Sequence, residues 1–216
     1  MKSLKDKKVV LTAGPTREYW DPVRYFTNSS SGRMGVALAQ YALKHGARVT
    51  LVLGPVEASV LHAVKSRRLQ IVNVVSAWDM YEAVKKHLPG TDYFLGTAAV
   101  VDYRPEHPLK QKFKREEPLV TLKLHGNPDI IAMVGHSRDH RPKSVVGFAL
   151  ETDHLIEHAQ DKMLRKRLDW IVANHESNLG AMEGSGTLLS RWGHRINVPK
   201  MSKDKLAQKI WQAVLS

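Results

Sequence analysis

The loop between residues 14 and 32 carries residue types suited to binding an anion. It follows the apolar segment Lys8–Thr12 and leads into a helix expected to begin at Gly32. Its glycine and polar members are Gly14, Arg24, Asn28, Ser29, Ser30 and Ser31. Backbone N–H groups at a helix start, together with the positive end of the helix dipole, bind phosphate. The serines fit two interpretations: they cap the helix, or their hydroxyls complete a nest for a phosphate.

A run of small residues ends another apolar segment and is followed by a carboxylate. Gly96, Thr97 and Ala98 close the apolar stretch, and Asp102 follows shortly after. Small side chains there permit either close packing under a helix or the approach of a flat ligand or ribose to the backbone. Asp102 is expected at the mouth of the strand, where a carboxylate binds a metal ion or a ligand hydroxyl.

Basic residues occur at two further places. Lys112–Arg115 lie on a long segment of weak periodicity, about 104–118, which is typical of a lid, a partner contact or a disordered segment. Lys162 and Lys166 stand one helical turn apart on the same face of a predicted helix. Each set is either a solvated surface or a group of cations that neutralises a triphosphate.

Two other positions and the histidines add to this pattern. Phe148, at the end of a predicted strand, is either a core residue or a platform for a nucleotide base. The segment Asn127–Asp129 predicts a helix start with a good cap, and by itself it indicates no more than that. The eleven histidines show no H-x-x-x-H pair on a convincing helix, so no zinc site built by the protein is predicted.

The elements that must position these residues alternate between strand and helix. Apolar segments predict strands over Lys8–Thr12, Arg48–Leu53, Leu69–Val74, Asp92–Val101, Ser144–Phe148 and Trp170–Ala173. Helical periodicity and capping residues predict helices over Gly32–His45, Ser76–Lys86, Asp153–Arg167 and Ser202–Val214. Such strands predict an α/β fold, a Rossmann-like three-layer sandwich with a mostly parallel sheet and a lid loop. Ligands of such sheets lie beyond the carboxyl ends of the strands.

Composition limits the class of protein. With 216 residues and 43% hydrophobic content, the chain is expected to form a single domain over residues 1–216. Cysteine is absent, which excludes disulfides and thiolate metal ligands and fits the cytoplasm. We identify no apolar run of membrane-spanning length and no signal peptide, and expect no membrane partner.

The same features also suggest two other classes of protein. The net charge of +12 suggests a basic nucleic-acid-binding protein, although no nucleic-acid motif is present and we expect no such partner. The Rossmann-like pattern suggests an NAD(P)-dependent oxidoreductase. However, the G-x-G-x-x-G spacing is missing, and no acidic residue follows the second strand at Leu53.

Taken together, the segments resemble phosphopantothenoylcysteine synthetase, also called phosphopantothenate–cysteine ligase, of the bacterial type. The resemblance covers almost the whole chain from about Lys8. In order, the matching motifs are LTAGPTRE, DPVR, N-x-S-S-G-x-M-G, AAVxDYRP, K-x-K-[KR], NPDI, GFAxET and the strand ending in Ala173-Asn174.

The resemblance implies a ligase of coenzyme A biosynthesis. The carboxylate of 4′-phosphopantothenate attacks the α-phosphate of CTP, and the amine of L-cysteine then attacks the resulting acyl-cytidylate. The bacterial motif spellings favour CTP over ATP. Mg²⁺ is expected on the triphosphate, with no metal site built by the protein. No FMN is expected, since nothing corresponds to the flavin-dependent decarboxylase domain of bacterial relatives. A homodimer is expected.

The resemblance also implies roles for individual residues. Asn28 serves the second half-reaction, Lys112 meets the phosphates as the lid closes, and Arg24 binds substrate or orders its loop. The implied nucleotide-binding positions are Gly96, Thr97, Ala98, Asp102, Lys112, Pro128, Asp129, Ile130, Ile131, Phe148, Lys162 and Lys166. Gly14, Ser30, Ser31 and Gly32 form the implied phosphate or substrate loop.

A few positions depart from the family pattern. Val101 and Leu150 stand where alanine is usual, and Arg115 replaces the last lysine of the lid motif. The segment Gly180–Gly184 replaces a phenylalanine and an asparagine of the family, so contacts from that loop are not carried over.

Overall fold

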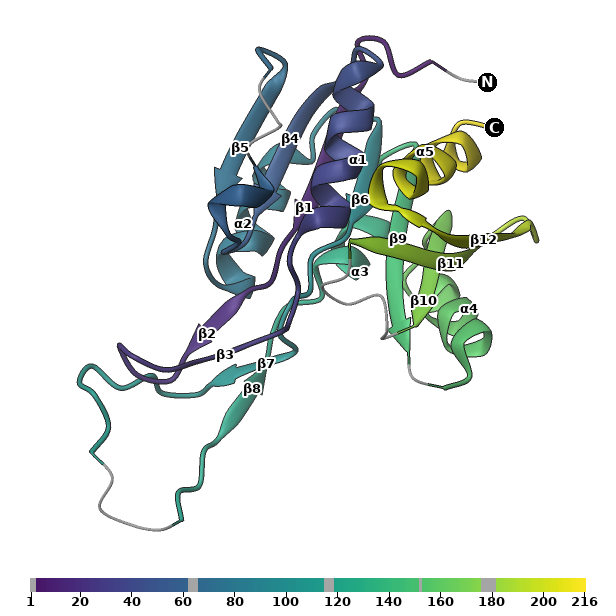
Figure 1. Cartoon of the computed structure of the whole chain (residues 1–216). Helices are drawn as coiled ribbons and strands as arrows, with labels where there is room; N and C mark the ends of the chain where they lie inside the picture. Colours follow the sequence, from purple (N-terminus) through teal and green to yellow (C-terminus); the bar gives the residue numbers. More distant parts are fainter. Residues whose placement is uncertain (1–2, 62–65, 115–118, 152, 176–181) are drawn as a thin grey trace.

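A central eight-stranded sheet organises the computed structural model, which describes residues 3–61, 66–114, 119–151, 153–175 and 182–216. The strand order is β12-β11-β10-β9-β6-β1-β4-β5 (Figure 1). The parallel strands are β1 (Lys8–Ala13), β4 (Arg48–Leu53), β5 (Leu69–Asn73), β6 (Tyr93–Gly96), β9 (Ser144–Glu151) and β10 (Trp170–His175). Strands β11 (Glu183–Ser190) and β12 (Arg195–Ser202) extend the sheet in antiparallel fashion.

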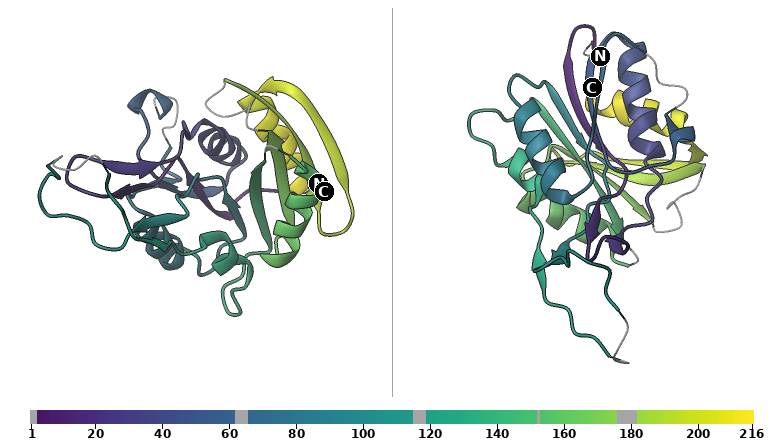
Figure 2. Two further views of the ribbon diagram at one scale, coloured as in Figure 1. Left: turned by 90° about the horizontal axis from the view of Figure 1, so that it is seen from below. Right: turned by 90° about the vertical axis from the view of Figure 1, so that its left-hand side faces the viewer.

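Helices cover both faces of this sheet. One face carries α1 (Arg33–Lys44) and α5 (Lys203–Val214), and the other carries α2 (Ala77–His87), α3 (Ile130–Gly135) and α4 (Leu155–Arg165). In the right-hand view of Figure 2, α1 and α2 lie on opposite sides of the strands. A short 3₁₀ turn, η1 (Ala58–Val60), follows β4. The predicted three-layer α/β sandwich with a mostly parallel sheet is confirmed.

The strands are apolar on both sides because each side packs under helices. In β1, Val9 and Leu11 belong to the core beneath α1 and α5, while Val10 belongs to the core beneath α2, α3 and α4. Alternate residues of a strand point to opposite faces, so a buried parallel strand reads as a continuous apolar run.

The predicted helix boundaries largely hold. Ser76 caps α2 through a capping box in which its side chain accepts from the Asp79 N–H. Asp129 caps α3 by accepting from the Ala132 N–H at 3.0 Å. At the end of α1, Gly46 takes a φ of +83°, as expected for a residue that terminates a helix.

The predicted strand Asp92–Val101 is too long. It ends at Gly96, and the next residues stay beside the chain that follows β1 without forming a regular strand: the Thr97 hydroxyl donates to the Thr12 carbonyl at 2.6 Å, and Ala99 forms an isolated bridge with Pro15. Residues 97–101 therefore form a loop beside the sheet rather than a continuation of β6.

Two small hairpins form an arm that projects from the sheet (Figure 1). They are β2–β3 (Arg17–Tyr19 and Tyr25–Thr27) and β7–β8 (Tyr103–Pro105 and Leu124–Gly126). The predicted lid of residues 104–118 therefore begins inside β7, and the connection to β8 runs over 106–123. Of this predicted lid, residues 115–118 lie outside the described residues.

Candidate functional site

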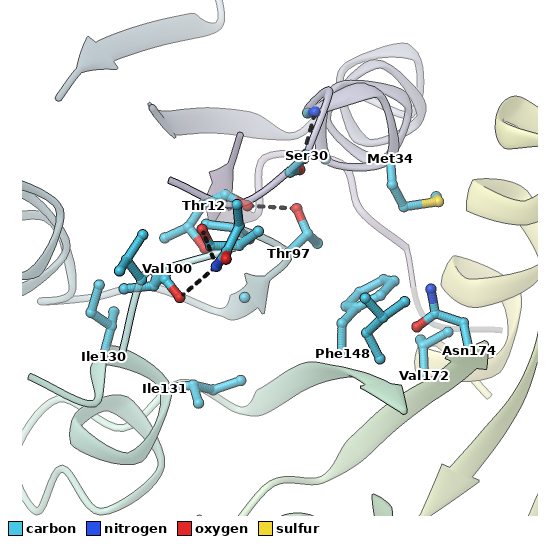
Figure 3. Close-up of a pocket in the computed structure, with 18 of the residues that line it drawn as sticks. Thr12, Ser30, Met34, Thr97, Val100, Ile130, Ile131, Phe148, Val172 and Asn174 are labelled. Carbon is cyan, nitrogen blue, oxygen red and sulfur yellow. Dashed lines mark hydrogen bonds between the residues drawn. The ribbon is translucent and has the colours of Figure 1, made fainter. Parts of the chain in front are cut away.

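A cavity of about 640 Å³ lies at the carboxyl edge of the parallel strands, beneath the start of α1 (Figure 3). Most of the predicted site residues line it. They are Asn28, Ser30, Ser31, Gly32, Gly96, Thr97, Ala98, Asp102, Pro128, Asp129, Ile130, Ile131, Phe148, Lys162 and Lys166. Gly14, Arg24 and Lys112 are not among the residues that line the cavity. The sheet thus brings segments that are far apart in the chain together at one place, as expected for the carboxyl edge of a parallel sheet.

The start of α1 forms one wall of the cavity. Gly32 occupies the N-cap with a φ of +74°, and no side chain caps the helix. The Ser30 hydroxyl accepts from the Gly32 N–H at 3.4 Å, outside the helix itself. The interpretation of the serines as helix caps is therefore wrong, and uncapped N–H groups at a helix start favour an anion.

Two glycines let this helix end approach the strands closely. A Cβ on Gly35 would lie 2.5 Å from both the Ala13 Cβ and the Thr97 Oγ1. Gly14 lies directly beneath the turn, since a Cβ on Gly32 would lie 3.3 Å from the Gly14 Cα. Gly14 thus packs against the turn at Gly32 and does not itself line the cavity.

Asn28 is held against the loop that follows β6. Its Nδ2 donates to the carbonyl oxygens of Ala99 at 3.3 Å and Val100 at 3.1 Å. Within the described part of the chain, no hydrogen bond reaches the Asn28 Oδ1. The amide is therefore fixed by its donor side and keeps an acceptor for a ligand.

The small residues at the end of β6 and directly after it are compatible with both of the interpretations considered. A Cβ on Gly96 would lie 2.9 Å from the Ile131 Cδ1, so Gly96 is required for close packing. Thr97, Ala98 and the exposed Asp102 line the cavity, where backbone and small side chains leave room for a ligand.

The two lysines of α4 and its C-cap belong to the cavity wall rather than to a solvated face. Lys166 Nζ lies 2.7 Å from Asp129 Oδ2, and its side chain is 19% exposed. Lys162 Nζ donates to the Phe148 carbonyl at 2.9 Å. The Lys166–Asp129 pair joins α4 to α3 across this side of the cavity.

Arg24 lies at the base of the arm, where it contacts Phe113, the neighbour of Lys112. Its Nη1 contacts Asp21 Oδ2 at 2.9 Å and the Phe113 carbonyl at 3.3 Å. The Phe113 N–H in turn donates to Asp21 Oδ2 at 3.1 Å, and its ring packs on Trp20. Of the two roles expected for Arg24, the geometry favours ordering over substrate contact.

The Asp21 carboxyl is buried at the centre of this contact, with 1% exposure. Burial opposes its ionisation, but N–H groups of Val23, Phe113 and Arg24, with the Arg24 guanidinium, outweigh it and lower the pKa of Asp21. Lys112 projects from the same segment and is exposed. Arg115, predicted as the last cation of the lid, lies outside the described residues.

Several cavity residues were not predicted. Met34, Asn174, Ser185, Lys203 and Leu206 line the side next to α1 and α5. In Figure 3, Met34 and Asn174 lie across the cavity from Val100 and Ile130. The position of Asn174 directly after a predicted buried strand could have identified it as a cavity residue. No feature of the sequence could have identified Lys203, because its position depends on β11 and β12, which the sequence pattern does not predict.

The described residues contain no group of three His, Asp or Glu side chains placed to hold a metal ion. His154 and His158 approach each other at the start of α4, with ring centroids 5.9 Å apart. Among the described helices, none combines the length and apolar character that crossing a membrane requires.

Comparison with known proteins places this arrangement in a family. The family described as DNA/pantothenate metabolism flavoprotein C-terminal domain matches residues 4–216. The coenzyme A biosynthesis bifunctional protein CoaBC of Haemophilus influenzae is 40% identical over 215 residues, covering 98% of this chain and 52% of that protein. The protein of the same description from Vibrio parahaemolyticus is 46% identical over 187 residues, covering 86% of this chain and 44% of its own length.

A solved structure shows the same fold. The crystal structure of the C-terminal domain of coenzyme A biosynthesis bifunctional protein CoaBC has a TM-score of 0.80 and 34% identity, covering 99% of this chain and 96% of that one. The present chain spans about half the length of the curated relatives it matches. Since the family match covers nearly every residue, the chain belongs to the family of DNA/pantothenate metabolism flavoprotein C-terminal domains.

Proposed function

We propose that the chain is a phosphopantothenate–cysteine ligase of coenzyme A biosynthesis that uses CTP. The observation that carries the proposal is the cavity at the start of α1, where the motif residues of that ligase family meet. Membership of the family and the likeness to a CoaBC C-terminal domain support it. The same findings favour the ligase over an NAD(P)-dependent oxidoreductase or a nucleic-acid-binding protein.

The reaction would proceed in two displacements. A carboxylate oxygen of 4′-phosphopantothenate bonds to the α-phosphorus of CTP as the bond to pyrophosphate breaks. The cysteine amine then attacks the acyl carbon, CMP leaves, and the amine loses a proton as the amide forms. The start of α1, Lys162 and Lys166 provide positive potential on the cavity wall, and Lys112 would add to it when the arm closes.

Asn28 suits the second displacement. An amide side chain carries no charge that would repel the acyl-cytidylate, and its Oδ1 can accept a hydrogen bond from the attacking amine. Its fixed position against Ala99 and Val100 supplies orientation without reorganisation during the reaction.

The residues present fit a Mg²⁺ ion carried by the nucleotide. Asp129 is engaged with Lys166 and the Ala132 N–H, which leaves Asp102 as the other carboxylate of the described cavity wall. Mg²⁺ would therefore be held by triphosphate oxygens and water, with Asp102 nearby, and would neutralise charge on the phosphates. We propose no role for FMN.

We also propose a homodimer in the cytoplasm. The arm exposes apolar side chains that a second copy would cover. They are Tyr25 at 38%, Phe26 at 38%, Tyr103 at 58% and Leu124 at 46% exposure. Light scattering is expected to give about twice the mass of the 24.3 kDa chain. A mass equal to that of one chain would contradict the dimer.

The experiment that tests the function uses Asn28→Asp. The chain is incubated with phosphopantothenate, cysteine and Mg²⁺, with CTP and ATP compared side by side. Wild type is expected to form the cysteine adduct with CTP, whereas the variant accumulates the acyl-cytidylate seen by mass spectrometry. The exposed Asn197 on β12 provides a matched control, Asn197→Asp, which should behave as wild type. Normal adduct formation by the Asn28 variant would remove that residue from its role.

A further inference from the structure

Asn127 lies where the arm meets α3, and the family resemblance assigns it no role. It follows Gly126, the last residue of β8, and its side chain lines the cavity. Two hydrogen bonds attach it to residues 97–102, the connection between β6 and β7. The Asn127 N–H donates to the Asp102 carbonyl at 2.7 Å, and the Nδ2 donates to the Val101 carbonyl at 2.7 Å. Asn127 therefore holds two successive carbonyl groups of the β6–β7 connection.

Asn28 contacts the same connection through the two carbonyl groups that come just before. Its Nδ2 donates to the Ala99 and Val100 carbonyl oxygens, whereas Asn127 binds the next two. Because each peptide group is planar, only two dihedral angles separate the Val100 carbonyl from the Val101 carbonyl. A displacement of one is therefore passed to the other. The position of the Asn28 amide thus depends on the bonds that Asn127 makes.

Arg104 determines which way the Asn127 amide faces. The Arg104 Nη1 donates to the Asn127 Oδ1 at 3.2 Å and to the Gly126 carbonyl at 2.7 Å. A guanidinium only donates and a peptide carbonyl only accepts, so the Oδ1 faces Arg104 and the Nδ2 faces Val101. The guanidinium also lies 5.6 Å from the centroid of the Trp78 ring on α2. The amide is therefore oriented from outside the cavity.

The N–H groups of the β6–β7 connection are bound separately, by residues that follow β1. The Ala99 N–H donates to the Gly14 carbonyl at 3.0 Å, and the Val101 N–H donates to the Thr16 hydroxyl at 3.0 Å. These bonds do not involve Asn127. Loss of the Asn127 side chain is therefore expected to shift carbonyl groups locally and to leave the connection beside β1.

We infer that Asn127 is a positioning residue for the second displacement, which holds Asn28 in place through the β6–β7 connection. Both ends of the Asn127 amide bond to the protein, so its effect passes through that connection rather than through contact with a substrate. Without its Nδ2, the Val101 carbonyl loses this donor, and the carbonyl groups that orient Asn28 move. This inference rests on the proposed ligase function and on the role proposed there for Asn28.

The test measures the two displacements separately in Asn127→Ala and Asn127→Asp. In a single turnover without cysteine, pyrophosphate release reports the first displacement. Conversion of the acyl-cytidylate to the cysteine adduct reports the second. Asn127→Ala is expected to slow conversion about 10- to 100-fold, whereas pyrophosphate release at saturating CTP stays within about threefold of wild type. Asn127→Asp keeps the shape and the Arg104 contact but lacks the donor to Val101, so it should slow conversion as much.

A double-mutant cycle tests whether the effect passes through Asn28. In the Asn28→Ala background, adding Asn127→Ala should change the rate of conversion by less than about threefold, because the group that Asn127 positions is already absent. The control is Asn197→Ala on β12. Asn197 also forms a side-chain hydrogen bond, with the Thr187 hydroxyl at 3.1 Å, but it is not among the residues that line the cavity. This variant should match wild type in both displacements.

Three results would overturn the inference. The first is wild-type conversion in both Asn127 variants. The second is an equal slowing of both displacements together with a lowered Tm, which would indicate a structural role. The third is a double variant in which the two effects multiply in full, which would show that Asn127 acts independently of Asn28. Failure of wild type to form any adduct would instead refute the ligase function.

Discussion

Replacing Gly35 with alanine tests whether the closeness of α1 to the strands is needed for activity. The added Cβ would lie 2.5 Å from the Ala13 Cβ and from the Thr97 Oγ1. Neither atom can yield easily, because Ala13 is fully buried at the end of β1 and the Thr97 hydroxyl is bonded to Thr12 at 2.6 Å. Non-bonded contact requires about 3.5 Å, so the start of α1 must move by about 1 Å.

The stability cost of this change is expected to be small. Overpacking costs about 1–3 kcal/mol, and alanine gains about 1 kcal/mol over glycine inside a helix. The net loss of about 0–2 kcal/mol lowers Tm by at most about 8 °C in a chain of this size. The activity should suffer more, since a displacement of about 1 Å at a positioning element costs about 10²-fold in rate.

The assay is kcat/KM for cysteine adduct formation, with Tm measured on the same samples. The control is Gly126→Ala on β8, where an added Cβ meets nothing within 4 Å. That variant should match wild type in both measurements. If Gly35→Ala kept kcat/KM within about threefold of wild type, the start of α1 would not be the anion site that we describe.

Three further predictions concern other parts of the molecule. Lys112→Gln should lower kcat by about 10²-fold or more, a loss of ~3 kcal/mol in transition-state stabilisation, whereas Lys110→Gln should leave steady-state kinetics unchanged. Asp21→Ala should release the arm, so that chymotrypsin at neutral pH cleaves the 106–123 connection faster than in wild type. Because the pKa of Asp21 lies below its usual 3.8, its carboxylate stays ionised until the pH falls through that lowered value. Below that pH, pepsin should cleave the 106–123 connection at the same rate in wild type and in Asp21→Ala. Asp169→Asn removes the buried carboxylate that pairs with Arg141 and Arg191, and should lower the free energy of unfolding by about 3–5 kcal/mol, measured by thermal unfolding. Asp161→Asn breaks only an exposed ion pair and should change the free energy of unfolding little.

The parallel part of the fold was predictable because its signals are local. Strands such as β1 and β4 are buried on both faces and are therefore continuously apolar. The caps at Ser76 and Asp129 follow from side chains that bond to the next backbone N–H groups along the chain. Parallel strands place their carboxyl ends at one edge, so the loops with the motifs could be expected to meet.

The antiparallel part was not predictable from such signals. Strand β11 contains Gly184 and Gly186, and β12 lies at the sheet edge and contains Pro199, which lacks an N–H group. Neither has the apolar run of a buried strand. The arm hairpins β2–β3 and β7–β8 have strands of three residues each, too short to show periodicity.

By itself, the sequence determined that a loop rich in glycine and serine precedes a helix at the carboxyl edge of a parallel sheet, since those features depend on neighbours along the chain. Only the tertiary structure decided that Lys203 and Asn174 share the cavity with that loop, and that Arg24 holds the arm. Those contacts join residues that are far apart in the sequence. The strands that bring these residues together have weak local preferences, so their positions are determined by how they pack against one another.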